Sequence, residues 1–410
     1  MLLTIFAFFA SAKISKKPVV IIPSHFGSRL HLNTTRQPYW YCPKTLTNRH
    51  VWIRVRDIFP PFINCVLDYL TVELDQKTGN LTSRPNTTFT TVDFGGIEGI
   101  KGIGPDYFGK YLPVNYEEYI NSFLEIGYKV RQDLFSAPYD WRFGLEQPQD
   151  YFDRLRELIE HAYSINDKAK VAILSHGFGA TLAHMFLTER MTAEWRKKYI
   201  DSSTYIAPAW SGSGQAFFST WRLRFPFVHI RFETLRNFVA SLGAFHSLFP
   251  NSIAYENSTL LIDPDGKNHT GAELIDILKK HGKLSPEQIR LADVNFKYTH
   301  VLPKKPDFNV NILYNSGVPT PMGLRLKSWD DVGAPIYGRG DSLMGSKVID
   351  WACDNWHSDS LQLRCYDVFS DAKQFHHRYL LKSPSMARLI RSWICKDYHK
   401  DNHMHTSADL

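Results

Sequence analysis

The fold of this chain is decided by the stretch Lys170-Val171-Ala172-Ile173-Leu174-Ser175-His176-Gly177-Phe178-Gly179-Ala180. The apolar run Val171 to Leu174 predicts a buried strand that begins at Lys170. A turn with two glycines follows, and a helical pattern extends from Gly179 to about Met191. A strand that passes through a tight turn into a helix is the unit from which parallel sheets covered by helices are built.

The same alternation extends outward in both directions and predicts an α/β fold. Further strands are expected at 19–22, 134–137 and 310–314, and further helices at 116–126, 151–162 and 384–393. The alternation fades between 210 and 306, a stretch rich in aromatic residues with isolated Gly and Pro, which predicts a cap inserted into the core. The core is thus expected over 13–209 and 307–398. His399, His403 and His405 fall in a flexible tail, 399–410, where a frayed terminus is favoured over a metal site.

Composition excludes several classes of protein. The 410 residues are 43% hydrophobic and 22% charged, which is typical of globular proteins. The net charge of +7 favours anionic partners only weakly, and basic runs as short as Arg196-Lys197-Lys198 argue against nucleic acid as a partner. Neither a CxxC pair nor another ligand cluster is present, so no metal and no cofactor is expected.

Several features predict passage through the secretory pathway. Residues 1–12 are largely apolar and end in Ala10-Ser11-Ala12, which favours a signal peptide over a buried first strand. No later stretch reaches 18 apolar residues, so the mature chain is expected to be soluble or peripheral. Five cysteines suggest one or two disulfides, and a secreted or lumenal location, such as a lysosome-like compartment, follows. Glycosylation is expected at five sequons, whose asparagines are Asn33, Asn80, Asn86, Asn257 and Asn268.

The glycine turn has the shape of a nucleophile elbow. An α/β-hydrolase places its nucleophilic serine in G-x-S-x-G, between a strand and a helix. Here the motif is Ser175-His176-Gly177-Phe178-Gly179, so glycine stands at the nucleophile position. Glycine cannot form an acyl-enzyme. Ser175 lies two residues earlier, at the end of the strand, where its side chain is not expected to point toward the helix N-terminus. Gly177 also fits a simple tight turn, because glycine readily takes a positive φ.

At this point the chain resembles the lecithin:cholesterol acyltransferase family, including its lysosomal phospholipase A branch. The most specific piece is Ala137-Pro138-Tyr139-Asp140-Trp141-Arg142, and the resemblance extends over about 19–393. It implies an α/β-hydrolase fold with an inserted cap and a lid loop over 42–65. Supporting pieces are Pro23 to Leu30, Pro208 to Gly212, Val318 to Pro321 and Gly340 to Ser342.

The resemblance also implies site residues. Asp341 takes the place of the family's acidic residue, and His377 that of its histidine, with His376 as the rival. Backbone N–H groups at Phe178 and in the turn near His25 would form the oxyanion hole. The family has Pro-Gly where this chain has Pro23-Ser24, which puts the second donor in question.

Cys42 and Cys65 match in spacing the family disulfide that closes the lid loop. Closing a loop of about 24 residues restricts the unfolded chain by roughly 3 kcal/mol. Nearby aromatics could touch a membrane or belong to the core; they include Tyr39, Trp40, Trp52 and Phe59. Cys353 could pair with Cys365 or Cys395, and the sequence leaves both pairings open.

The leading hypothesis is a lipid O-acyltransferase or phospholipase family member that acts on or binds phospholipid and is inactive because of Gly177. One alternative is an active enzyme with a displaced nucleophile such as Ser175 or Ser213. The other is an interaction protein that binds no lipid. The sequence carries no signal for the oligomeric state, the acyl donor or the acceptor.

Overall fold

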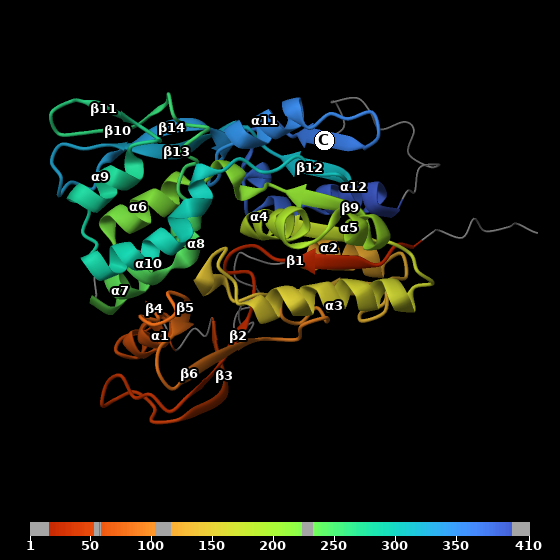
Figure 1. Ribbon diagram of the computed structural model, residues 1–410, viewed down its shortest axis with the longest axis horizontal. Coiled ribbons are helices and arrows are strands. Elements are labelled where there is room, and N and C mark those ends of the chain that lie inside the picture. The colour runs from red at the N-terminus through yellow and green to blue at the C-terminus, as the bar shows by residue number, and fades with distance from the viewer. Residues whose placement is uncertain (1–15, 53–56, 58, 103–115, 224–232, 396–410) are drawn as a thin grey trace, which may run out of the picture.

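The computed structural model describes residues 16–52, 57, 59–102, 116–223 and 233–395 (Figure 1). The expected signal peptide, 1–12, and the expected tail, 399–410, lie outside the described residues.

A six-stranded sheet in the order β15-β12-β9-β8-β1-β7 forms the centre, and all its neighbours are parallel. Its strands are β1 (Val19–Ile22), β7 (Leu134–Ser136), β8 (Val171–His176), β9 (Ile200–Ile206), β12 (Asn309–Tyr314) and β15 (Leu363–Asp367). Every residue of β1 and β8 is buried, because helices cover both faces of the sheet. The predicted α/β-hydrolase fold is confirmed.

Side chains of β1 alternate between the two faces. Val20 and Ile22 pack with α3 (Gln149–Ile165) and α4 (Phe178–Met185). Val19 and Ile21 pack with α2 (Glu117–Leu124) and α12 (Pro384–Cys395). The covering helices also include α5 (Ala193–Tyr199) and α11 (Lys347–Asn355). This two-sided burial explains why the strands are continuous apolar runs in the sequence.

A helical cap lies beside the core, on the left of Figure 1. It contains α6 (Gly214–Arg222), α7 (Glu233–Ser241), α8 (Gly243–Ser247), α9 (Leu274–His281) and α10 (Pro286–Phe296). A four-stranded sheet, β11-β10-β13-β14, completes it with β10 (Thr259–Ile262), β11 (Asn268–Thr270), β13 (Gly317–Arg325) and β14 (Ala334–Asp341). This sheet joins strands from both sides of the expected boundary at 306, and β14 ends at a candidate site residue, Asp341.

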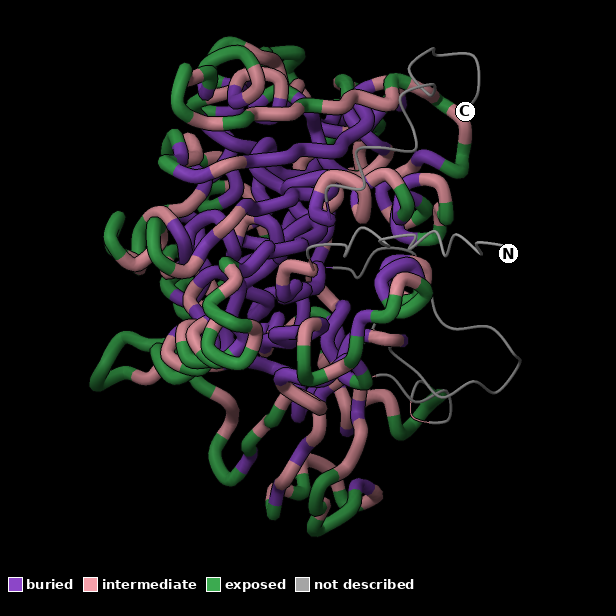
Figure 2. Tube along the Cα trace, turned by 90° about the vertical axis from the view of Figure 1, so that its right-hand side faces the viewer, coloured by how far each residue is buried: buried purple, intermediate pink, exposed green. Residues whose placement is uncertain are grey.

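A smaller lobe follows the first turn of the chain. It holds an antiparallel sheet of β2 (Leu30–Thr34), β3 (Leu46–Trp52) and β6 (Thr87–Thr91), the hairpin of β4 (Val72–Leu74) and β5 (Leu81–Ser83), and α1 (Phe62–Leu70). Buried residues fill the middle of the molecule in Figure 2, whereas this lobe at the lower end is mostly exposed or intermediate. We call residues 30–91 the lid lobe.

The structure shows two disulfides. Cys42 pairs with Cys65 within the lid lobe, as the resemblance implied. Cys353 pairs with Cys365, which decides between the two open alternatives. Cys395 is buried, with its sulfur 3.3 Å from the Tyr128 hydroxyl. Among the helices that the structure describes, none combines the length and the apolarity needed to cross a bilayer.

Candidate functional site

The strand-to-helix turn at Gly177 has elbow geometry. Gly177 lies between β8 and α4 with φ 55° and ψ −122°, a conformation that strains any residue with a side chain. Its N–H donates to the carbonyl of Ile206, and its carbonyl accepts from the N–H groups of Ala180 and Ala209. A Cβ on Gly179 would lie 2.0 Å from the Pro23 carbonyl oxygen, so only glycine fits there. The turn therefore has the backbone of an elbow, with glycine at its centre.

Asp341 and His377 form a buried pair beside this turn. His377 Nδ1 lies 2.6 Å from Asp341 Oδ2, and each residue is 3% exposed. The backbone N–H of His377 also donates to the Asp341 carbonyl. The other carboxylate oxygen accepts from the N–H groups of Leu343 and Met344. This network fixes Asp341 and orients the imidazole with Nδ1 toward the carboxylate.

The opposite nitrogen of His377 faces the elbow. An ideal Cβ built on Gly177 would lie 3.1 Å from His377 Nε2. The structure thus brings Gly177, Asp341 and His377 together, as the resemblance implies. His376 instead directs its Nε2 to the carbonyl of Asp371, at 3.1 Å, away from this arrangement.

His176 packs against His377, and Tyr116 in turn contacts His176. The ring of His176 lies 4.6 Å from the ring of His377, and its Nε2 lies 3.3 Å from the His377 carbonyl oxygen. Burial, together with the charge that His377 would carry, holds the pKa of His176 well below its usual value. Tyr116 OH lies 3.5 Å from His176 Nδ1 and accepts a 2.6 Å hydrogen bond from the N–H of Ser24. His176 is therefore a neutral support. No motif marked Tyr116 or Ser24 as part of this site.

The turn after β1 packs against the elbow through aromatic rings. The His25 ring contacts the rings of Trp141, Phe178 and Phe245. Both ring nitrogens of His25 are buried without a hydrogen-bond partner in the described structure, and burial lowers its pKa to about 3. The N–H of Phe178 belongs to the first turn of α4, where backbone donors have no intrahelical acceptor. The two predicted oxyanion positions are thus neighbours.

The two candidate displaced nucleophiles are directed elsewhere. Ser175 Oγ donates to the carbonyl of Thr204 in the neighbouring strand, at 3.4 Å. Ser213 Oγ donates to the carbonyl of Leu343, at 2.7 Å. Neither hydrogen bond directs a hydroxyl to an imidazole.

The six-residue signature over 137–142 connects the core to the lid lobe. Arg142 is completely buried and forms an ion pair of 2.6 Å with Asp140. Its guanidinium also donates to Ser83 Oγ and lies 3.6 Å from the centre of the Phe89 ring. The signature therefore has a clear role in holding the lid lobe in place.

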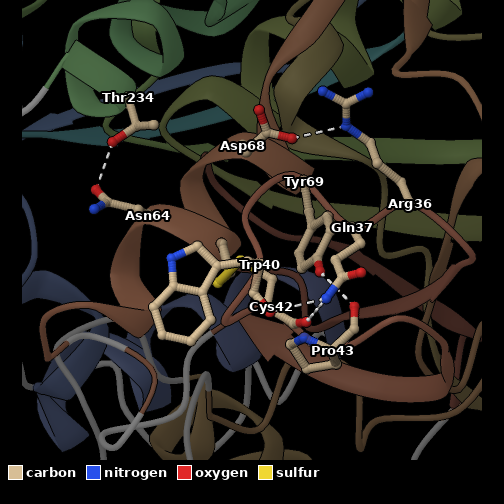
Figure 3. Close-up of a disulfide and its surroundings, with 10 residues drawn as sticks. Arg36, Gln37, Trp40, Cys42, Pro43, Asn64, Asp68, Tyr69 and Thr234 are labelled. Atoms are coloured by element: carbon tan, nitrogen blue, oxygen red, sulfur yellow. Dashed lines mark hydrogen bonds and ion pairs between the residues drawn. A yellow bond between two sulfur atoms is a disulfide. The ribbon is translucent and has the colours of Figure 1, made fainter.

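The lid lobe has exposed aromatic side chains, and one of them, Trp40, lies near the Cys42–Cys65 disulfide (Figure 3). Trp40 is 88% exposed, and Phe59 and Phe62 are 58% and 49% exposed. Trp52, in contrast, is half-buried and packs against the core, because it stacks on Phe26 and contacts Trp141. The aromatics that the sequence grouped together thus divide into surface and core, while Tyr39 stacks on Tyr41.

A cavity of about 310 Å³ lies beside the disulfide. Its lining is mostly apolar, with one basic and one acidic residue, and consists of Pro43, Leu46, Arg49, Val51, Asp57, Phe62, Cys65, Val66 and Tyr69. Phe62 belongs both to this lining and to the exposed aromatic set. The lid lobe therefore combines an outward apolar surface with a hollow that could accept an apolar group.

The sequons are mostly accessible. Asn80, Asn86, Asn257 and Asn268 are exposed. Asn33 is half-buried, and its side chain accepts a hydrogen bond from the N–H of Asn48. In the part of the chain that the structure describes, no three His, Cys, Asp or Glu side chains are grouped so that they could hold a metal ion.

A family model and individual related proteins both match this chain, and they point to the same family. The model of the lecithin:cholesterol acyltransferase family matches residues 47–299, a range that includes the elbow but not Asp341 or His377. A lysosomal phospholipase A and acyltransferase from Bos taurus is 25% identical over 352 residues, which are 83% of each chain. A phosphatidylcholine-sterol acyltransferase from Gallus gallus is 22% identical over 371 residues, 85% of this chain and 84% of that one. A chain from the crystal structure of the Tle4-Tli4 complex shares the fold, with a TM-score of 0.50 and 12% identity, over 92% of this chain and 98% of that chain.

Proposed function

The chain belongs to the lecithin:cholesterol acyltransferase family, and from this premise we propose that it binds phospholipid at a membrane surface without carrying out acyl transfer. One observation carries the proposal. Gly177 occupies the elbow of a site in which the Asp341–His377 pair is otherwise assembled.

The chemistry of such a site depends on a hydroxyl at the elbow. A serine there would attack the ester carbonyl while His377 Nε2 accepts its proton, and Asp341 would hold the imidazole in the required tautomer. The N–H of Phe178, and one from the turn at His25, would stabilise the oxyanion. With glycine at the elbow no acyl-enzyme forms, and loss of a triad nucleophile lowers turnover by about a millionfold in subtilisin.

The lid lobe supports the lipid-binding part of the proposal. Exposed Trp40, Phe59 and Phe62 would enter the interfacial region of a bilayer, where aromatic side chains are favoured. The adjacent cavity of about 310 Å³ would take part of an acyl chain. The net charge of +7 would add a salt-sensitive attraction to anionic headgroups.

Location is part of the same proposal. Two disulfides and four exposed sequon asparagines support a lumenal or extracellular compartment, where disulfides persist. Relatives named as lysosomal enzymes support passage through the secretory pathway.

The experiment measures binding and turnover together. The purified chain is floated with vesicles of phosphatidylcholine containing phosphatidylserine, and release of a fluorescent acyl chain is followed in the same sample. We expect co-flotation that weakens with salt, and no release above the vesicle background. Release that a serine-reactive phosphonate abolishes would instead establish an active enzyme with a displaced nucleophile. Absence of co-flotation at low salt would favour an interaction protein that binds no lipid.

A further inference from the structure

The space where a side chain at position 177 would begin is already occupied. An ideal Cβ on Gly177 would lie 2.5 Å from Ser24 Oγ, a distance that real Cβ atoms essentially never show. The same point lies 3.1 Å from His377 Nε2 and 3.4 Å from His377 Cε1. Ser24 Oγ and His377 Nε2 therefore both lie within about 3 Å of the point where a side chain at 177 would begin.

The backbone of Ser24 cannot withdraw to make room. Its N–H donates to Tyr116 OH at 2.6 Å, and its carbonyl accepts from the N–H of Gly27 at 2.9 Å. The preceding residue, Pro23, presses against the start of α4 so closely that Gly179 has no room for a Cβ. Only rotation of the Ser24 side chain can clear the space.

We infer that Ser24 and position 177 compete for the same space: the Ser24 hydroxyl obstructs a side chain at 177 beside His377, so that a hydroxyl at 177 reacts faster when the one at 24 is removed. This inference rests on the proposed function, because it takes the elbow as a site that lacks only its nucleophile. It identifies Ser24 as the residue that determines whether a side chain at position 177 has room beside His377.

Two observations assign Ser24 a filling role and not that of a nucleophile. Among the residues that the structure describes, no hydrogen bond joins the Ser24 hydroxyl to His377, whose side-chain partner is Asp341. Ser24 also lies in the turn after β1, whereas Gly177 directly precedes Phe178, whose N–H belongs to the first turn of α4 and has no intrahelical acceptor. Oxyanion stabilisation is thus arranged around position 177.

A fluorophosphonate probe reports the predicted reactivity directly. The hydroxyl introduced at 177 attacks phosphorus, fluoride leaves, and His377 Nε2 accepts the hydroxyl proton. The product is one phosphonate ester per chain, which intact-mass spectrometry counts. Conformational strain at φ 55° applies to any residue at 177, so Ser24→Gly/Gly177→Ala serves as the control that has the Cβ without the hydroxyl.

Four chains are compared beside that control: the natural protein, Ser24→Gly, Gly177→Ser, and Ser24→Gly/Gly177→Ser. We expect the double variant to be labelled once, the Gly177→Ser variant to be labelled at least about tenfold more slowly, and the other two to remain unlabelled. Equal labelling of the single and double variants would overturn the inference, as would a folded double variant that is not labelled. Labelling of the natural chain that Ser24→Ala removes would make Ser24 itself the nucleophile and would also overturn it.

A second measurement decides the matter if the double variant does not fold. Ser24→Gly alone should expose His377 Nε2, so diethyl pyrocarbonate should modify His377 at least about threefold faster than in the natural chain, as quantified by peptide mass spectrometry. An unchanged rate would overturn the inference. Vesicle flotation of the same samples keeps the two proposals distinct, because loss of lipid binding contradicts the proposed function without affecting the phosphonate result.

Discussion

The site around His377 and the lid lobe differ in how their residues are held. His377, Asp341 and His176 are buried and joined by hydrogen bonds to one another or to backbone. In the lid lobe, Trp40 is 88% exposed. It lies near the disulfide between Cys42 and Cys65, which are separated by 23 positions in the sequence. The first region is fixed by its interior contacts, and the second depends on a covalent link.

This difference explains how the Asp341–His377 pair can be retained beside a glycine at position 177. Asp341 accepts hydrogen bonds from Leu343 and Met344 and ties the end of β14 to the segment that carries His377. Removing it would leave several buried polar groups unpaired, which is costly whether or not the site reacts. Structural demand alone is enough to maintain the pair.

The largest expected effect is a loss of folding stability at acidic pH, because neutral histidines are buried in the interior and not in the lid lobe. Burial lowers the pKa of His25 and His246 to about 3 and that of His184 to about 4. Because these folded-state values lie below the unfolded value, the unfolded chain binds protons first as pH falls below about 6.5, and stability decreases. Between pH 7 and 5 the loss is about 2 kcal/mol for each histidine, or roughly 6 kcal/mol for the three.

Urea unfolding at pH 7 and at pH 5 measures this loss. His246→Phe should reduce the pH dependence by about 2 kcal/mol, because it removes one protonation site of the unfolded chain. His161→Phe is the matched control at an exposed position and should leave the dependence unchanged. A stability that is flat between pH 5 and 7 would contradict the burial of these rings as neutral groups and would favour an acidic compartment.

The next effect tests the structural role of the pair. Asp341→Ala should lower the free energy of unfolding by about 3–5 kcal/mol, because it leaves the His377 ring and two backbone N–H groups without their acceptor. Asp341→Asn retains one acceptor oxygen and should lose less. The free energies come from urea unfolding at pH 7. A loss below about 1 kcal/mol for Asp341→Ala would show that the pair does not stabilise the fold.

The central sheet was predictable because its strands carry a strong local signal. Val19 to Ile22 is apolar throughout, and the structure places β1 over the same residues. The cap sheet was not recognised, because β13 contains Pro319 and Pro321, and proline argues against a strand. Both prolines lie opposite β14, whereas β10, on the other side of β13, pairs only with Leu324 and Arg325. Among the strands that the structure describes, each proline therefore has a neighbour on one side only, which is where a strand tolerates proline.

The candidate site was predictable in part and for a different reason. A family resemblance pointed to Asp341 and His377, and the fold brings them to the elbow. The close approach of the Ser24 hydroxyl to position 177 could not be predicted. The sequence showed only that Pro23-Ser24 stands where the family has Pro-Gly. Which atom lies closest to position 177 depends on how the turn after β1 packs against α4, and a single sequence does not show that packing.

The third effect concerns the covalent link. Cys42→Ser/Cys65→Ser should destabilise the chain by about 3 kcal/mol, since the disulfide restricts the unfolded loop. Hydrogen exchange should accelerate first in α1 and β3, because the disulfide joins Cys65 in α1 to Cys42 in the segment just before β3. The pair Cys353→Ser/Cys365→Ser is the control, and it should leave exchange in α1 unchanged. Equal acceleration throughout the central sheet would show that the lid lobe does not open separately.

The smallest expected effect concerns the exposed surface and involves no loss of stability. Trp40 is 88% exposed, so Trp40→Ser should leave the thermal midpoint unchanged. Its indole would enter the bilayer interface on binding, and its removal should weaken the vesicle Kd about tenfold, equivalent to about 1.4 kcal/mol. Phe369→Ser is the matched control, because Phe369 is an aromatic residue 67% exposed outside the lid lobe. Flotation with phosphatidylcholine and phosphatidylserine vesicles compares the two variants at equal salt. If both weaken binding equally, lipid contact is spread over the surface, and the lid lobe loses its assigned role.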